Sequence, residues 1–262
     1  MSEYYKASRG KDWNYGGKNW KLSRSKIDLF LECPRCFYVD NKLGVKRVPG
    51  FPFSINSAVD FLLKQEFDAH RAKGEQHPLQ KEYGLDARPA VHEELDEWRR
   101  NFGGVKYLHE STGLLVTGAI DDLWIDDKKR EYIVVDYKAT AKDEAVKELD
   151  KEWQDGYKRQ MEVYQWLLRQ NGLKVSDIGY FVYCTGRMDR KAFDKRIDFD
   201  VNLIEYKGND SWVEKILREI KECLDSSIIP ESGNSCDHCA YWNAREKVEK
   251  NDGVETGQLR ML

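Results

Sequence analysis

The sequence predicts an α/β domain in which helices flank a central mixed β-sheet and a four-cysteine metal site joins the two ends of the chain. Three observations predict this fold. The chain has 262 residues, of which 40% are hydrophobic, so it can build one continuous core. Its expected elements run in the order helices, β-hairpin, helix, two strands and helix. Two Cys-x-x-Cys pairs lie near opposite ends of the sequence.

Helical patterns follow an irregular arm that we expect over residues 1–21. One helix begins near Ser23 and is ended by Pro34. A second helix begins near Asn56, and one broad face of it consists of Val59, Leu62, Leu63, Glu66, Phe67 and His70. The polar residues 74–90 show the weakest pattern of the chain.

The centre of the chain is rich in strands. β-Branched and apolar residues predict strands over residues 114–120, 122–125, 131–137, 178–184 and 193–201. A polar turn between the second and the third of these predicts a β-hairpin. Helices are expected over residues 155–169 and 211–223. The domain is therefore expected to span residues 22–245, and residues 246–262 to form a polar tail.

The charge of the chain is nearly balanced, with 43 Lys and Arg residues against 46 Asp and Glu residues and a net charge of −3. Non-specific affinity for nucleic acid grows with the number of phosphates that basic side chains neutralise, so this balance argues against a protein that coats DNA through bulk charge. A basic cleft on an acidic body is compatible with it. The sequence has no run of 18 apolar residues, and its N-terminal segment lacks the apolar stretch of a signal peptide. These features predict a cytoplasmic protein without a membrane partner.

Four of the six cysteines form two pairs, Cys33 with Cys36 and Cys236 with Cys239. A cytoplasmic chain rarely keeps disulfides, so such pairs indicate metal binding or redox chemistry. Two intervening residues let both thiolates of a pair reach one metal from a tight turn, and the two pairs together supply four ligands. The other two cysteines, Cys184 and Cys223, lie in apolar runs and are expected in the core.

Two carboxylates and a lysine gather on the expected hairpin. Asp136 and Lys138 are two residues apart on one strand, so their side chains project to the same face. Asp121 precedes the partner strand, and pairing of the two strands would bring it close to Asp136. A carboxylate on an apolar strand needs a neutralising cation, and carboxylate oxygens suit Mg²⁺ or Mn²⁺. Such a metal and a lysine together suit hydrolysis of a phosphodiester.

The helix that follows carries Gln160 and Tyr164 one turn apart on the same face. We expect these two side chains to orient the lysine or to hydrogen-bond the substrate backbone. Each of these short motifs is common by itself. Their order, on a strand, a second strand and a helix, is what makes them specific.

The segments that carry these residues resemble a known family. GAID (118–121), VVDYK (134–138) and QMEVY (160–164) resemble the motifs of PD-(D/E)XK nucleases of the RecB-like branch, which includes the CRISPR adaptation nucleases. Residues 22–44 resemble the start of the adaptation nucleases, and the resemblance covers about residues 22–245. It implies a restriction-endonuclease-like core that binds DNA.

The resemblance also implies roles for single residues. Asp121 and Asp136 match the metal ligands of the family, and Lys138 matches its catalytic lysine. Many RecB-like enzymes have a further histidine ligand on an early helix, and Asp60 stands in the comparable place. We therefore expect Asp60 to be the third metal ligand, and His70 to be a solvated or capping residue.

A cofactor at the four cysteines is implied as well. Cluster-bearing members of the family hold a 4Fe–4S cluster with one N-terminal cysteine and a C-terminal group of cysteines. Arg245 stands where the last cysteine of that group is expected, and Cys36 supplies a fourth ligand instead. We favour the 4Fe–4S cluster slightly, and two symmetric pairs suit Zn²⁺ equally.

These observations predict a Mg²⁺- or Mn²⁺-dependent deoxyribonuclease that acts on single strands or duplex ends, in DNA repair, recombination or defence against mobile elements. One alternative is a non-cleaving, nucleic-acid-binding scaffold with the same fold. Another is a redox or metal-sensing protein. Some of the eight Trp residues could form stacking platforms for bases, whereas Trp124 and Trp166 are expected to pack in the interior.

Overall fold

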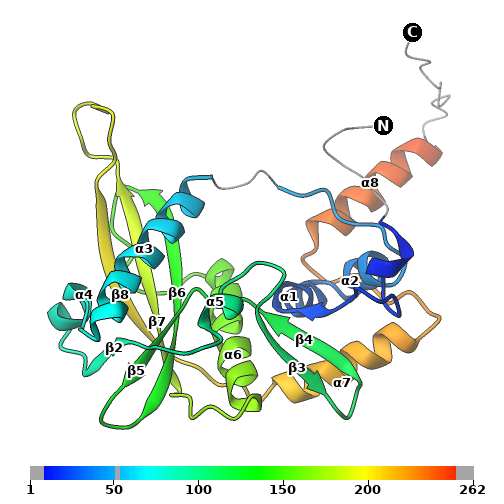
Figure 1. The fold of residues 1–262 in the computed structure, drawn as a ribbon. Coiled ribbons are helices and arrows are strands. Elements are labelled where there is room, and N and C mark those ends of the chain that lie inside the picture. The colour runs from blue at the N-terminus through cyan, green and yellow to red at the C-terminus, as the bar shows by residue number, and fades with distance from the viewer. Residues whose placement is uncertain (1–8, 51–53, 252–262) are drawn as a thin grey trace. The chain divides into compact units, whose positions relative to one another are not determined.

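The computed structural model describes residues 9–50 and 54–251 (Figure 1). The described chain divides into two compact units. The first, which we call the sheet unit, takes its described residues from 21–25 and 50–218, and the second, the cysteine unit, takes them from 1–20, 26–49 and 219–262. The single domain expected over residues 22–245 stays a prediction, because two compact units can belong to one domain.

The sheet unit contains a five-stranded mixed sheet, as the sequence predicts. Its strands lie in the order β2 (Ala87–Pro89), β5 (Asp122–Asp126), β6 (Glu131–Lys142), β7 (Ile178–Arg187) and β8 (Phe199–Lys207). Strands β6 and β7 are parallel, and the other neighbours are antiparallel. The predicted hairpin is confirmed, because β5 and β6 pair directly.

A second sheet of the same unit has three strands. Its order is β1 (Leu22–Ser23), β4 (Leu114–Gly118) and β3 (Val105–His109). Helix α6 (Asp155–Gln170) contacts strands of both sheets, and Figure 1 shows it between them. Residues 160–168 of this helix are all buried. Gly118 permits the close approach, since a Cβ atom there would lie 2.7 Å from Cε1 of Tyr164.

The remaining helices of the sheet unit are α3 (Ser54–Lys73), α4 (Pro78–Glu82) and α5 (Leu95–Trp98). Helix α3 covers β6 and β2 and inserts Phe67 into an aromatic stack. The ring of Phe67 lies 5.3 Å from Trp124 and 5.8 Å from Tyr137, and Trp124 in turn stacks on Tyr180. Trp124 is fully buried, as the sequence predicts, and so is the core of this sheet around it.

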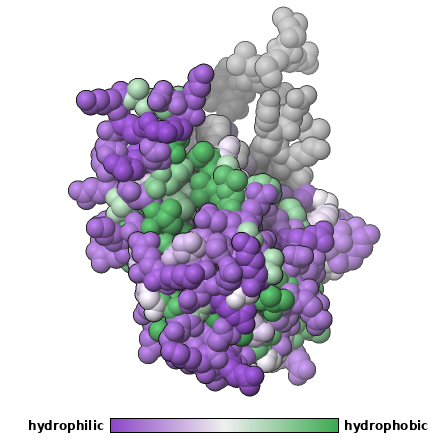
Figure 2. Space-filling model, turned by 60° about the vertical axis from the view of Figure 1, so that its left-hand side comes forward, coloured by the Kyte–Doolittle hydropathy of each residue, from purple (hydrophilic) through white to green (hydrophobic). Residues whose placement is uncertain are grey.

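Several details differ from the sequence prediction. The strand expected over residues 193–201 begins only at Phe199, because Asp194 and Lys195 have positive φ angles of 52° and 59° and form a turn. The weakly patterned residues 74–90 contain α4 and β2, and β3 was not predicted at all. Leu62 does not share the buried face of α3 and is 59% exposed. Figure 2 shows a largely hydrophilic face with a larger apolar area in its upper half and smaller apolar areas below it.

The cysteine unit is helical. It contains α2 (Pro34–Asn41), α8 (Asp237–Asn251) and most of α1 (Arg24–Glu32) and α7 (Val213–Asp225). Pro34 separates α1 from α2, as expected. Helix α8 continues past residue 245, where the polar tail was predicted to begin, and residues 252–262 lie outside the described residues, as do residues 1–8 of the expected N-terminal arm. Among the described helices, none combines the length and the apolar character needed to cross a bilayer.

Candidate functional site

A cavity of about 510 Å³ opens in the sheet unit beside the hairpin. It is lined by residues of α3, β6 and α6 and by the segment between β4 and β5. The charged residues among its lining are four cations and two carboxylates, namely Arg24, Lys64, Arg99, Lys138, Asp60 and Asp121. The cavity lining is therefore locally basic although the whole chain is slightly acidic, which is the distribution expected of a site that receives a phosphate backbone.

Asp136 on β6 does not itself line the cavity, but its partners Lys138 and Gln160 do. The Asp136 side chain is fully buried, and its Oδ1 atom accepts a 2.7 Å hydrogen bond from Nε2 of Gln160. Its Oδ2 atom forms an ion pair with Lys138 but accepts no hydrogen bond from the described residues. Burial raises the pKa of Asp136 to about 7, while the neighbouring Lys138 acts in the opposite direction.

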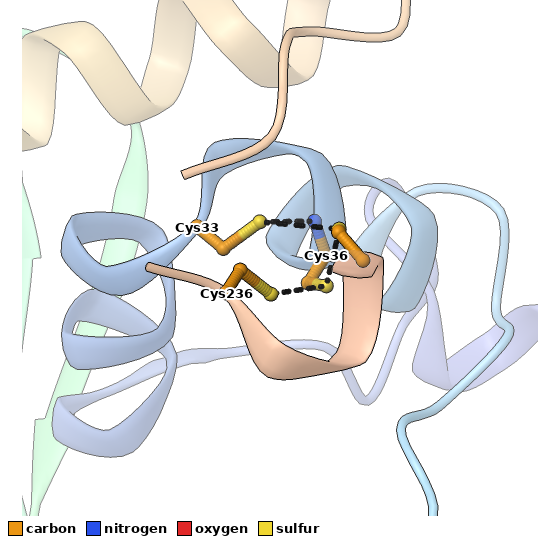
Figure 3. A group of neighbouring side chains, drawn as sticks. Cys33, Cys36 and Cys236 are labelled. Atoms are coloured by element: carbon orange, nitrogen blue, oxygen red, sulfur yellow. Dashed lines mark hydrogen bonds between the residues drawn. The ribbon is translucent and has the colours of Figure 1, made fainter. Parts of the chain in front are cut away.

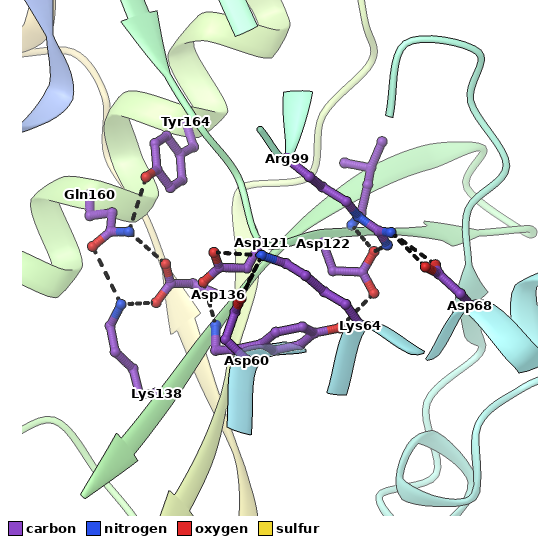
Figure 4. Close-up of polar contacts among 12 residues, drawn as sticks. Asp60, Lys64, Asp68, Arg99, Asp121, Asp122, Asp136, Lys138, Gln160 and Tyr164 are labelled. Carbon is purple, nitrogen blue, oxygen red and sulfur yellow. Dashed lines mark hydrogen bonds and ion pairs between the residues drawn. The ribbon is translucent and has the colours of Figure 1, made fainter. Parts of the chain in front are cut away.

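Asp121 lies next to Asp136 because β5 and β6 pair in the predicted way. Its Oδ2 atom accepts a 2.9 Å hydrogen bond from the backbone N–H of Tyr137, which follows Asp136. Figure 4 shows the Asp121 and Asp136 side chains close together, with Asp60 on the neighbouring helix α3. The sequence-based expectation that the hairpin gathers these two carboxylates therefore agrees with the structure.

Asp60 reaches the same cavity from α3, where it lies one turn before Lys64. The Nζ atom of Lys64 is 2.9 Å from Asp60 and 3.7 Å from Oδ1 of Asp121. Burial raises the pKa of Asp60, and the charge of Asp121 adds to this effect. His70, which lies later on α3 and was not expected to be a ligand, does not line the cavity. Its ring instead contacts the ring of His77 at 4.8 Å.

Gln160 connects Asp136 and Lys138 on β6 with Tyr164 on its own helix α6. Besides its bond to Asp136, its Oε1 atom lies 3.4 Å from Nζ of Lys138, and its Nε2 atom donates a 3.0 Å hydrogen bond to the hydroxyl oxygen of Tyr164. Tyr164 is only 4% exposed and lies behind Gln160, away from the cavity lining. Burial raises the pKa of this phenol, so it stays protonated. The structure thus brings the two residues into one network with Asp136 and Lys138.

Sequence reasoning missed two of the cations around this network, Lys64 and Arg24. Lys64 follows Asp60 by four residues on a helix, a spacing that would have identified it as a partner of the same site. Arg99 is the residue that directly follows α5, and no local sequence pattern connects it with the hairpin. Arg24 stands at the start of α1 and is likewise brought to the cavity only by the tertiary fold.

A buried ionic network supports the floor of the cavity. Asp122 is fully buried and accepts hydrogen bonds from Arg71, Arg99 and the hydroxyl of Tyr137, the last at 2.8 Å. Asp68 on α3 pairs with both arginines. Two carboxylates and two guanidiniums therefore balance each other directly behind Asp121, and this fixes β5 against α3.

The carboxylates of the cavity fit a hard divalent cation by their chemistry. Asp60, Asp121 and Asp136 supply oxygen atoms, and Oδ2 of Asp136 is buried with the Lys138 ammonium as its partner. Their oxygens are not gathered as closely as ligands around one ion. Within the described residues, the four cysteines are the one group of His, Cys, Asp or Glu side chains that meets that description.

The four cysteines occupy equivalent positions at the starts of two helices. Cys33 immediately precedes α2 and Cys36 is its third residue, while Cys236 immediately precedes α8 and Cys239 is its third residue. All four sulfur atoms lie within 4.8 Å of one another, and none forms a disulfide (Figure 3). The prediction that the two pairs meet at one site, joining N- and C-terminal segments, is confirmed. Cys184 is buried, as predicted, whereas Cys223 is only partly buried and does not belong to the core.

Comparison with known proteins identifies one family. The family model described as the PD-(D/E)XK nuclease superfamily matches residues 53–244. The matched region contains the three carboxylates, Lys138, Gln160 and the second cysteine pair. The match names the superfamily and no branch within it, and a search of curated proteins finds no match to this chain.

Proposed function

Because the chain belongs to the PD-(D/E)XK nuclease superfamily, we propose that it is a metal-dependent DNA nuclease of the RecB-like branch. The observation that carries this proposal is the network of Asp136, Lys138 and Gln160 beside a basic cavity that Asp121 also lines. Such a nuclease would act in the reducing cytoplasm, where free cysteines are kept, in DNA repair, recombination or defence against mobile elements.

Asp121 and Asp136 would hold a Mg²⁺ or Mn²⁺ ion, with Asp60 as a third ligand. When bound, the ion would lower the pKa of a water molecule and polarise the phosphoryl oxygen. Asp136 would bind as the carboxylate, with Gln160 keeping its other oxygen in place. Lys64 now neutralises Asp60 and Asp121, so its ammonium would turn away toward the substrate phosphates when the carboxylates take up a metal.

Lys138 would act on the reacting phosphate itself. Its Nζ atom is held between Asp136, Oε1 of Gln160 and the ring of Tyr157, whose centroid is 4.5 Å away. From this position the ammonium can orient the attacking water or stabilise the negative charge that develops on the phosphate. Arg24 and Arg99 would hold neighbouring phosphates at the cavity rim.

Two aromatic residues beside the cavity favour single-stranded DNA or duplex ends as the substrate. Trp153 is 54% exposed and contacts Tyr157, which lines the cavity, with 5.7 Å between ring centroids. The Nζ atom of Lys142 lies 5.4 Å above the Trp153 ring. An exposed indole beside a lysine is suited to stack an unpaired base and to hold its phosphate.

The direct test is cleavage of labelled single-stranded and double-stranded DNA by the full chain with Mg²⁺, with Mn²⁺ and with excess chelator. We expect metal-dependent cleavage that is lost in Asp136→Asn and in Lys138→Ala. Lys128→Ala removes an exposed lysine from the β5–β6 turn and should leave the rate unchanged. Cleavage that persists in chelator or in both site variants would contradict the proposal, and DNA binding without turnover would favour the scaffold alternative.

The non-catalytic cofactor of the proposed nuclease lies at the four cysteines. A 4Fe–4S cluster and a Zn²⁺ ion are the two candidates, and either would connect segments that are 200 residues apart in sequence. Its identity does not depend on the cleavage chemistry.

A further inference from the structure

The distances among the cysteine sulfurs distinguish the two candidate cofactors. The Sγ atom of Cys36 lies 3.6 Å from that of Cys236 and 3.6 Å from that of Cys239, and the Sγ atoms of Cys33 and Cys239 are 3.7 Å apart. The remaining pairs also lie within 4.8 Å. The four sulfurs therefore surround a space that fits a single atom.

A tetrahedral zinc ion requires sulfur atoms at this separation. With Zn–S bonds of about 2.3 Å, the ligand sulfurs of a tetrahedral site lie about 3.8 Å apart. In a 4Fe–4S cluster each thiolate binds a different iron and the four bonds point outward from the cube, so the ligand sulfurs lie roughly 6 Å apart. The arrangement of this chain fits the first and not the second. We propose that the four cysteines hold one mononuclear zinc ion in place of the 4Fe–4S cluster implied by the family resemblance.

The surroundings of the sulfurs match the charge of such a site. Four thiolates and one Zn²⁺ carry a net charge of −2, which must be compensated in a partly buried place. Backbone N–H groups of Gly233 and Cys36 point at Sγ of Cys33, at 3.3 and 3.4 Å. The guanidinium of Arg47 lies 3.1 Å from Sγ of Cys236 and is held there by Glu32.

The two helix starts add to this compensation. Because each pair takes the position before a helix and the third position within it, the positive ends of the α2 and α8 dipoles are both directed at the sulfurs. Pro34 at the first position of α2 lacks an N–H, so the turn can close around Cys33 without leaving an unpaired donor. The local sequence thus arranges each pair as a two-thiolate ligand before any metal is present.

Metal analysis of the full chain tests the proposal without reference to nuclease activity. The protein is purified without oxygen from cells supplied with both iron and zinc, and its metals are measured by mass spectrometry together with its visible absorbance. We expect about one zinc per chain, almost no iron and a colourless protein. Iron near four per chain with a brown absorbance, or a folded protein without bound metal, would each overturn it.

Cobalt gives a second readout that does not require a cysteine variant to fold. Replacing the native metal with Co²⁺ should produce the intense visible bands of a tetrahedral thiolate site, and titration of the thiols should release one equivalent of metal. Bands typical of an octahedral ion with oxygen ligands would show that the metal sits elsewhere.

Arg47 provides the matched pair of variants for the proposed charge compensation. Arg47→Gln should keep one zinc per chain but weaken its affinity, measured by competition with a chromophoric chelator, by about tenfold, as is usual for loss of a residue that contacts a metal ligand. Arg35→Gln makes the same charge change between Cys33 and Cys36, at an exposed side chain without a described contact to sulfur, and should have little effect. Equal effects of the two variants would show that Arg47 acts only through net charge.

Discussion

The two candidate metal sites of this chain differ in what neutralises their ligands. In the cavity of the sheet unit, Lys64 and Lys138 pair with the carboxylates, so the acidic groups are balanced by the protein itself. In the cysteine unit, four sulfurs lie together with one guanidinium and a few N–H groups beside them. The first arrangement is stable without a metal, whereas the second leaves several thiolates without compensation.

This difference indicates how each metal is used. An ion in the carboxylate cavity must compete with two ammonium groups, so it is expected to bind weakly and exchange readily. An ion among four thiolates replaces no cation and is expected to stay bound and to contribute its binding free energy to folding. The sheet unit would then depend on metal for its chemistry, and the cysteine unit for its stability.

The largest effect is expected from removing the buried charge of the cavity. Asp136→Asn should lower the initial rate of DNA cleavage by at least about 10³-fold, equivalent to about 4 kcal/mol of activation free energy, because a ligand charge is lost. The amide can still accept the hydrogen bond from Gln160, so the unfolding temperature should not fall. Zinc content should be unchanged. If the variant lost both its activity and its zinc, the two sites would not be independent.

The next largest effect concerns stability of the sheet unit. Asp122→Asn leaves Arg71 and Arg99 buried beside Asp68 alone and should lower the free energy of unfolding by about 3 kcal/mol, as measured by chemical denaturation. The comparison variant is Asp127→Asn, which removes an exposed ion pair with Arg88 and should cost at most about 1 kcal/mol.

The same denaturation experiment, repeated after the metal has been removed from the cysteines, tests whether the two units unfold independently. The loss caused by Asp122→Asn should persist with and without zinc, because the buried ion network lies entirely in the sheet unit. A stability loss that disappears on zinc removal would mean that the network and the metal stabilise one cooperative structure.

The hairpin of the candidate site could be predicted from the sequence because its signals are local. Alternation along β6 places Asp136 and Lys138 on one face. The short turn between β5 and β6 sets the register of the two strands, and this register brings Asp121 beside Asp136. One helical turn relates Gln160 to Tyr164 in the same way. Each of these relations spans few residues, so the period of the element determines it.

The rest of the site depends on packing between distant segments. Arg99 reaches Asp122 only because α5 and α3 meet behind the hairpin, and no spacing encodes that meeting. The start of β8 was also misjudged, because Asp194 and Lys195 form a left-handed turn, and a lysine rarely adopts a positive φ angle. Spacing likewise predicted that the cysteines share a metal, but the choice between cluster and zinc required distances between sulfur atoms.

A smaller effect is expected of pH on the affinity of the carboxylate cavity for its metal ion. Burial raises the pKa of Asp136 to about 7, so below this value the carboxyl carries a proton that Mn²⁺ must displace. The apparent affinity for Mn²⁺, measured by calorimetry, should therefore rise about fivefold between pH 6 and pH 7 and about twofold more before it levels off near pH 8. In Asp136→Asn the affinity should be weaker throughout, and this rise should be absent. A steep rise that continued well above pH 7 would assign the proton to another group.

The smallest expected effect is on DNA affinity, and it tests which of the two units contacts the DNA. Trp153→Ala removes the exposed indole beside the cavity and should weaken binding of single-stranded DNA by about 1 kcal/mol, or about fivefold, because one stacked base loses its platform. Trp242 on α8 is similarly exposed, at 60%, but belongs to the cysteine unit. Trp242→Ala should leave affinity unchanged in the same fluorescence-anisotropy titration. If Trp242→Ala were the more damaging change, the cysteine unit would be part of the DNA-binding surface, and its metal would serve recognition as well as stability.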